Sequence, residues 1–136
     1  AKCSSRGAYS MSDISQHLAH AGEDIETSRL LLDNQRYRAC ISRAYYAMYY
    51  AAQALLVQRN ITARTHKGVI QQFSQYFIKS KDLPQRMVED LRQAYYFRQL
   101  SDYEEAAIIN QEQAIRISAA SADFVEQVRE YLERNG

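Results

Sequence analysis

The chain has 136 residues, a formal net charge of +1 and 46% hydrophobic residues. This length suits a single domain that can bury a core without disulfides or metals. No run reaches the ~20 apolar residues that a membrane-spanning helix needs, and the first ten residues lack the apolar centre of a secretory signal, so we expect no membrane association. Cys3 and Cys40 form no disulfide framework, and we expect free thiols in a reducing cytoplasm.

The composition favours helix, because one Pro and four Gly leave few breaks and strong helix formers are abundant. We expect residues 1–11 to be a disordered leader or a tag remnant, and residues 12–136 to form one helical domain. Apolar periodicity predicts helices over 12–33, 36–59, 66–78, 84–100 and 111–134. Their short connections predict an all-α, antiparallel bundle of four to five helices.

The first helix carries one mostly apolar stripe, in steps of three and four, formed by Ile14, Leu18, Ala21, Ile25, Ser28 and Leu32. The second helix is apolar nearly all round from Ala44 to Ala52, which predicts a central position in the bundle. Its tyrosine hydroxyls must each find a partner or water. So much apolar surface exceeds what one small bundle can hide, and we therefore expect a homodimer.

The remaining helices have recognisable ends. Thr65 is a suitable N-cap for the third helix, and Pro84 suits the first position of the fourth. Residues 101–110 are expected to form a loop. The fifth helix is expected to bury a stripe of Ala114, Ile117, Ser121, Phe124, Val128 and Tyr131.

Charge is distributed unevenly along the chain. No acidic residue lies between Asp33 and Asp82, whereas eight basic residues do. A block of one sign predicts contact with a polyanion or with an acidic partner. The candidate nucleic-acid-binding residues are Arg36, Arg38, Arg43 and Lys67. The alternative, at about even weight, is that these scattered cations are solvated side chains on helix surfaces.

Arg98 interrupts the apolar stripe of the fourth helix. Seven residues at ~100° each place it within ~20° of Leu91 around the helix axis. A guanidinium on the core-facing side is costly unless it is paired or borders a cleft. One interpretation is a stabilising ion pair with Asp102, four residues on. The other is an arginine held in a groove, where its planar fork can bind a phosphate through two hydrogen bonds.

Three segments resemble motifs of the HEPN family, in the family's order. Residues 42–52 (SRAYYAMYYAA) resemble its second-helix signature. Residues 65–70 (THKGVI) are similar to the third-helix entry of a small stand-alone branch, and residues 98–103 (RQLSDY) to its arginine-to-Asp-Tyr motif. The resemblance covers the chain from Met11 onward.

This resemblance implies a four- or five-helix bundle that pairs through a two-fold interface. It also implies a minimal nucleotidyltransferase as partner protein, because many such genes form a toxin–antitoxin pair with one. Several HEPN proteins are ribonucleases that need no metal, and no cofactor is expected here. They use an arginine followed four to six residues later by a histidine, one set from each subunit.

The sequence departs from that active pattern, because Tyr103 occupies the position of the histidine. Unperturbed tyrosine, with a pKa of ~10, is a poor base at pH 7. Asp102 could serve as the base, Arg98 could stabilise charge on the phosphate, and His66 could supply the missing acid if it reaches the groove. A lone histidine at a helix entry is, however, more often a capping or surface residue.

Three functions therefore remain open at this point. The first is a toxin or effector that cleaves RNA with Arg98, Asp102, Tyr103 and His66. The second is a non-catalytic module that binds a nucleotide or nucleic acid, or docks the nucleotidyltransferase, with Tyr103 as a target for nucleotide transfer. The third is a purely structural bundle.

Overall fold

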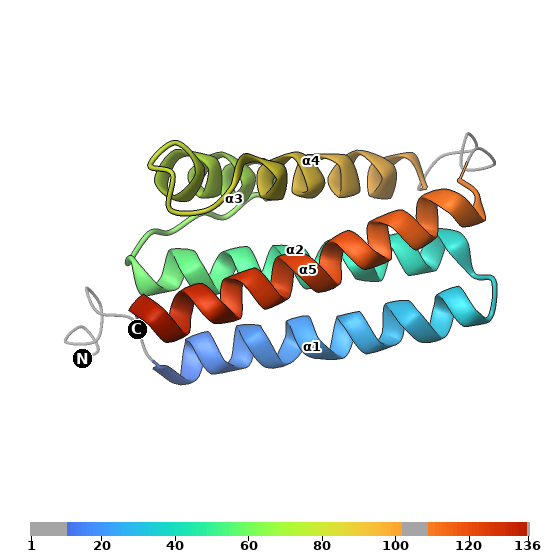
Figure 1. Cartoon of the computed structure of the whole chain (residues 1–136), viewed down its shortest axis with the longest axis horizontal. Coiled ribbons are helices and arrows are strands. Elements are labelled where there is room, and N and C mark those ends of the chain that lie inside the picture. The colour runs from blue at the N-terminus through green and yellow to red at the C-terminus, as the bar shows by residue number, and fades with distance from the viewer. Residues whose placement is uncertain (1–10, 102–108, 136) are drawn as a thin grey trace.

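The computed structural model describes residues 11–101 and 109–135. Residues 1–10 of the predicted leader and the predicted site residues Asp102 and Tyr103 lie outside these ranges, whereas Met11 is the first residue of the first helix. Within them the chain forms five α-helices and one π-helical segment (Figure 1). These are α1 (Met11–Asp33), α2 (Tyr37–Gln58), α3 (His66–Phe73), η2 (Ser74–Ile78), α4 (Gln85–Leu100) and α5 (Gln111–Asn135). The predicted all-α bundle is confirmed.

The four long helices alternate in direction along the chain. α1 and α4 run one way, and α2 and α5 run the other (Figure 1). α2 lies in the middle of the bundle and contacts α1, α3, α4 and α5. α3 is short and is seen nearly end-on beside the first turns of α4 (Figure 1). The central position predicted for α2 is therefore confirmed.

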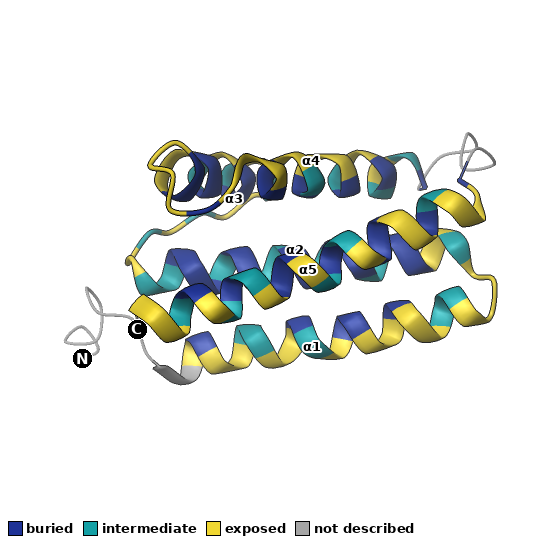
Figure 2. Cartoon of the chain, viewed as in Figure 1, coloured by how far each residue is buried: buried dark blue, intermediate teal, exposed yellow. Residues whose placement is uncertain are grey.

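Burial follows the helical periodicity, with dark, buried residues on the inner faces and exposed residues on the outer ones (Figure 2). All six residues of the predicted α5 stripe are buried: Ala114, Ile117, Ser121, Phe124, Val128 and Tyr131. Small residues of α2 are fully buried as well, namely Ala44, Ala47, Ala51 and Ala54. Side chains from α2, α3, η2, α4 and α5 share this core.

The third helix differs from the prediction in its second half. It begins at His66 as expected, and the Thr65 side chain accepts a hydrogen bond of 2.9 Å from the amide of Gly68. After Phe73 the backbone changes to a π-helical turn, in which the amide of Lys79 donates to the carbonyl of Ser74. Such turns are rare and occur frequently at functional sites.

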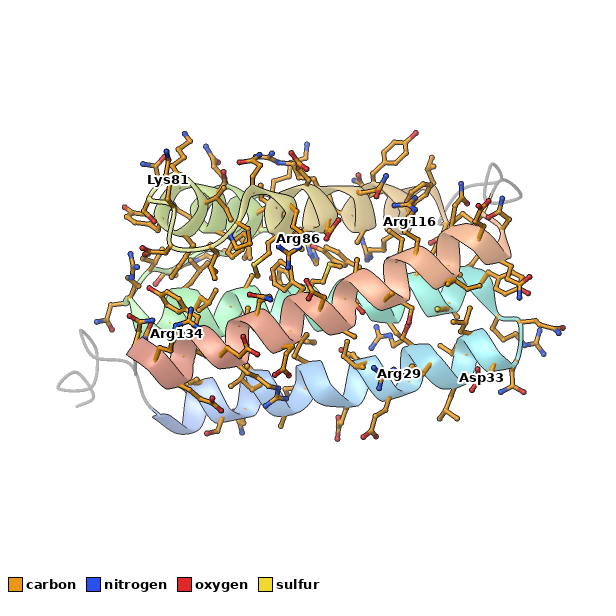
Figure 3. All side chains as sticks on the ribbon, viewed as in Figure 1. Arg29, Asp33, Lys81, Arg86, Arg116 and Arg134 are labelled. Carbon is orange, nitrogen blue, oxygen red and sulfur yellow. The ribbon has the colours of Figure 1, made fainter. Side chains whose placement is uncertain are left out.

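The start of the fourth helix differs by one residue. Pro84 is the N-cap, with extended backbone (φ −73°, ψ 151°), and the helix begins at Gln85. Polar contacts then join α4 to α5 across the surface, where Arg86 pairs with Asp123 at 3.0 Å and Arg116 donates to Gln93. Figure 3 shows Arg86 and Arg116 where these two helices lie next to each other.

A small polar network lies inside the core. The Ser28 hydroxyl is 3.2 Å from the Cys40 carbonyl, 3.3 Å from the Cys40 thiol and 3.2 Å from the Ser118 hydroxyl. These contacts tie α1, α2 and α5 together, and burial raises the pKa of the Cys40 thiol. Among the helices described, none combines the length and the apolar character needed to cross a bilayer.

Candidate functional site

Arg98 lies in the last turn of α4, where a cation is favoured by the helix dipole. Its side chain is half-buried and turns toward α2. The Nη2 group donates a 2.9 Å hydrogen bond to the hydroxyl of Tyr46, and the guanidinium lies 5.2 Å from the centre of the Tyr46 ring. The prediction that Arg98 points toward the interior of the protein thus agrees with the structure.

His66 is the first residue of α3 and packs into a cluster of tyrosines. Its Nδ1 is 2.7 Å from the hydroxyl of Tyr45, which is fully buried. The Tyr49 ring lies 4.6 Å away and the Tyr95 ring stacks at 5.9 Å. We call Tyr45, Tyr46, Tyr49, His66 and Tyr95 the aromatic cluster. The aromatic cluster connects α2, α3 and α4 where His66, at the start of α3, contacts the other two helices.

The aromatic cluster brings Arg98 and His66 together. The Tyr46 ring is 5.8 Å from the His66 ring, and the Tyr46 hydroxyl binds Arg98. Arg98 and His66 are 32 positions apart in the chain, so their proximity is a product of the tertiary structure. The sequence indicates only a conditional role for His66 and does not single out Tyr45 or Tyr46. The available signal was the need of tyrosine hydroxyls in an apolar helix for polar partners.

Electrostatics keep His66 neutral near pH 7. Burial and, second, the positive charge of Arg98 lower the pKa of the imidazole below its ordinary value. Burial and the neighbouring tyrosines raise the pKa of Tyr45, so its hydroxyl stays protonated. A buried hydroxyl proton needs an acceptor, and Nδ1 of His66 is placed to be one. When the Tyr45 hydroxyl donates to Nδ1, the imidazole proton lies on Nε2.

The predicted nucleic-acid-binding cations occupy different environments. Arg43 forms an ion pair of 2.9 Å with Asp24 of α1, and its guanidinium also lies 4.8 Å from the centre of the Tyr46 ring. Burial raises the pKa of Asp24, and Arg43 opposes that shift. Arg38 donates to the carbonyl of Ser101, next to the end of α4.

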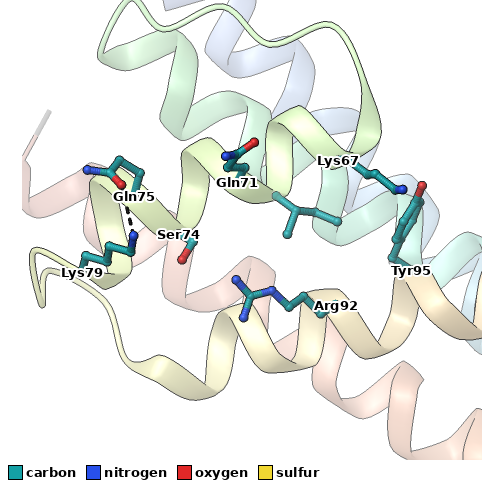
Figure 4. A pocket seen from close by; sticks show the side chains of 8 residues that line it. Lys67, Gln71, Ser74, Gln75, Lys79, Arg92 and Tyr95 are labelled. Carbon is teal, nitrogen blue, oxygen red and sulfur yellow. Dashed lines mark hydrogen bonds between the residues drawn. The ribbon is translucent and has the colours of Figure 1, made fainter.

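Arg36 and Lys67 are both exposed, and Lys67 borders a cavity. Arg36 is the residue before the first turn of α2. Lys67 lines a cleft of about 380 Å³ between the α3–η2 segment and α4 (Figure 4). Tyr95 lines the same cleft and thereby connects it to the aromatic cluster. The four predicted cations therefore do not form one patch.

Asp102 and Tyr103 belong to the segment that the structure does not describe. Their predicted roles, including the ion pair with Arg98, stay predictions. In the described part of the chain, no group of three or more His, Cys, Asp or Glu side chains is arranged to hold a metal ion.

The chain resembles a family model and several proteins of other organisms. The model of the HEPN domain matches residues 14–134. The chain is 30% identical over 120 residues to "Putative toxin MJ0142" of Methanocaldococcus jannaschii, covering 88% of this chain and 82% of that one. It is 33% identical over 113 residues to "UPF0332 protein glr0978" of Gloeobacter violaceus, covering 82% of this chain and 90% of that one.

Proposed function

Because this chain belongs to the HEPN family, we propose that it is a toxin-type HEPN protein that acts on RNA at the site around Arg98 and His66. One observation carries the proposal: a half-buried guanidinium is fixed by the Tyr46 hydroxyl within the same aromatic cluster as a neutral histidine. Two relatives from Methanocaldococcus jannaschii carry the names "Putative toxin MJ0142" and "Putative toxin MJ0605", which supports the toxin role.

Arg98 is suited to bind a phosphate of the RNA backbone. Its contact with Tyr46 engages one terminal nitrogen, and no other described residue binds the remaining N–H groups of the planar fork, which would donate to phosphate oxygens. The Tyr46 contact also orders the side chain in advance, so that less conformational entropy is lost when the phosphate binds.

The reaction that we propose at this phosphate is attack by the neighbouring 2′-hydroxyl. The 2′-oxygen bonds to phosphorus as its proton passes to a base, the bond to the 5′-oxygen breaks, and that oxygen takes a proton from water. The products are a 2′,3′-cyclic phosphate and a 5′-hydroxyl end. Arg98 would stabilise the charge that develops on the phosphate, and neutral His66 would be the base.

A second candidate, capture of RNA without cleavage, is favoured by the hydroxyl of Tyr45. If that hydroxyl donates to Nδ1, Nε2 of His66 carries a proton and can only donate to a phosphate. His66 can act as a base only if the Tyr45 hydroxyl rotates to accept a hydrogen bond from Nδ1–H. The orientation of one buried hydroxyl thus separates a nuclease from a binding module.

The two candidates are separated by one pair of assays on the pure protein, which measure binding and cleavage of single-stranded RNA. A nuclease produces cyclic-phosphate ends, and Arg98→Ala and His66→Gln abolish them. A binding module leaves RNA intact, and Arg98→Ala weakens the complex. If the wild-type protein neither binds nor cleaves RNA, the proposed function is wrong.

We also propose that the protein forms a homodimer and pairs with a minimal nucleotidyltransferase. The exposed apolar side chains of Tyr96 and Ile115, 56% and 49% accessible, support an interface involving α4 and α5. Sedimentation of Tyr96→Ser and Ile115→Ser variants tests the dimer, because both should shift toward monomer. Co-purification with a minimal nucleotidyltransferase tests the pairing, and an absent complex would contradict it.

A further inference from the structure

The cleft between α3–η2 and α4 concentrates positive charge. Lys67 and Lys79 line it from one side and Arg92 from the other (Figure 4). Among the described residues that line it, none carries a carboxylate. The sequence contributes to this imbalance, because the α3–η2 side belongs to the segment between Asp33 and Asp82 that has no acidic residue.

The cations of the cleft lack the partners that other cations have. Arg59 pairs with Asp82 at 2.8 Å and Arg86 pairs with Asp123 at 3.0 Å. Within residues 11–101 and 109–135, by contrast, neither Lys67, Lys79 nor Arg92 forms an ion pair. Like charges that converge in a concave site repel one another, and a bound anion would relieve that repulsion.

Neutral polar groups complete the cleft. The Arg92 side chain extends from α4 toward Ser74, and Lys67 extends toward the Tyr95 hydroxyl (Figure 4). At the far end the Lys79 ammonium donates to the Gln75 side chain at 3.3 Å, within the π-helical segment. Three cationic donors therefore face one space of about 380 Å³, a size within the range of small-ligand sites.

We propose that this cleft binds phosphate, as the phosphate of a nucleotide that is either free or part of an RNA strand. Arg92 supplies the planar fork that binds two phosphate oxygens, and Lys67 and Lys79 supply point charges. Tyr95 offers an aromatic face beside them, the surface on which a base stacks. An acidic peptide would bind to the cations of the cleft, but it carries no base to stack on the Tyr95 ring.

The RNA form of this proposal rests on the proposed function. Tyr95 lines the cleft and stacks on His66 at 5.9 Å, so the cleft and the Arg98–His66 site are adjacent. A strand held at Arg98 would place a neighbouring phosphate in the cleft. Binding of a free nucleotide, in contrast, requires only the cleft.

The experiment compares two double variants that lose the same charge. Lys67→Gln with Arg92→Gln removes two cations from the cleft. Arg29→Gln with Arg134→Gln removes two exposed cations from α1 and α5, away from it (Figure 3). Fluorescence anisotropy with a labelled single-stranded oligoribonucleotide measures affinity over a range of salt concentrations, and ATP and a poly-glutamate peptide are titrated in parallel.

We expect the cleft variant to bind RNA about tenfold more weakly than the matched control, because each lost contact is a charge-assisted hydrogen bond. Its plot of log affinity against log salt should be shallower by about 1.4, at about 0.7 for each lost phosphate contact on a single strand. Equal RNA affinity and equal ATP affinity in the two double variants would overturn the proposal.

The remaining outcomes separate this inference from the proposed function. ATP binding that depends on the cleft, without any RNA binding by the wild-type protein, would uphold the phosphate site and contradict action on RNA. RNA binding that depends on Arg98 but not on the cleft, with no ATP binding, would uphold the proposed function and overturn the proposed phosphate site in the cleft. Poly-glutamate binding as tight and as cleft-dependent as that of RNA would also overturn phosphate recognition.

Discussion

Replacement of Arg98 by Met separates the structural role of this side chain from its proposed role in binding phosphate. The variant loses the 2.9 Å hydrogen bond to Tyr46 and the cation–π contact at 5.2 Å. A hydrogen bond to a charged group contributes about 1.5–3 kcal/mol and an exposed cation–π contact about 0.5–1 kcal/mol. Because the Arg98 side chain is only half-buried, water compensates for part of the lost hydrogen bond and part of the lost cation–π contact. We therefore expect the free energy of unfolding of Arg98→Met to be about 1 kcal/mol lower than that of the wild type.

The matched control is Tyr46→Phe. It removes the acceptor of the same hydrogen bond and keeps the guanidinium. Its loss of stability should be similar, at about 1 kcal/mol. The two variants should differ in RNA affinity, which we expect to fall about tenfold or more in Arg98→Met, whereas in Tyr46→Phe it should change by less than about threefold, or about 0.6 kcal/mol.

Urea unfolding measures the first quantity and fluorescence anisotropy with labelled RNA the second. With a slope of about 2 kcal/mol per molar urea, a loss of about 1 kcal/mol lowers the unfolding midpoint by about 0.5 M. If both variants lose stability and RNA affinity in parallel, Arg98 acts through its contact with α2 and not on phosphate. That result would refute the reasoning.

Three further changes test the fold and its charges. Burial lowers the pKa of His17 in α1, as it lowers that of His66. As the pH falls below about 6.5, these histidines therefore take up protons in the unfolded chain before they do so in the folded protein. The stability that they contribute should be complete above that pH and decline below it. Urea midpoints from pH 7.5 to pH 5 measure this decline, which should be shallower when both histidines are replaced by Gln. An unchanged decline in that variant would show that other groups cause the pH dependence. Thr65→Ala removes the N-cap of α3 and should reduce stability by about 1 kcal/mol, whereas Thr65→Ser should largely preserve it. Phe124→Ala opens a cavity in the core and should reduce stability by about 3–5 kcal/mol in urea unfolding, and a loss below about 1 kcal/mol would place Phe124 outside the core.

Much of the fold was predictable because helices follow local rules. Ile117, Phe124 and Val128 follow one another at spacings of seven and four residues, which places them on one side of a helix, and all three are buried. The predicted cap at Thr65 binds as expected, because capping depends on residues within one turn. The same reasoning placed Arg98 on the side of α4 that carries the buried Leu91.

The candidate site was predictable only in part. The resemblance of three motifs identified the family and drew attention to Arg98 and His66. It did not indicate that the Tyr46 hydroxyl binds Arg98, nor that Tyr45 holds His66. The π-helical segment after Phe73 was also missed, because helical periodicity does not distinguish an α-helical turn from a single wider turn.

What the sequence determined by itself is the direction in which each side chain leaves its own helix, since 3.6 residues per turn fix that angle. Only the tertiary structure decided which side chains meet. Lys67 and Arg92 line one cleft, and Arg98 and His66 both contact the aromatic cluster. Both arrangements depend on the axial position and the rotation of α3 and α4 where they pack against α2. That register depends on the combined fit of many side chains across the core, and no single segment contains it.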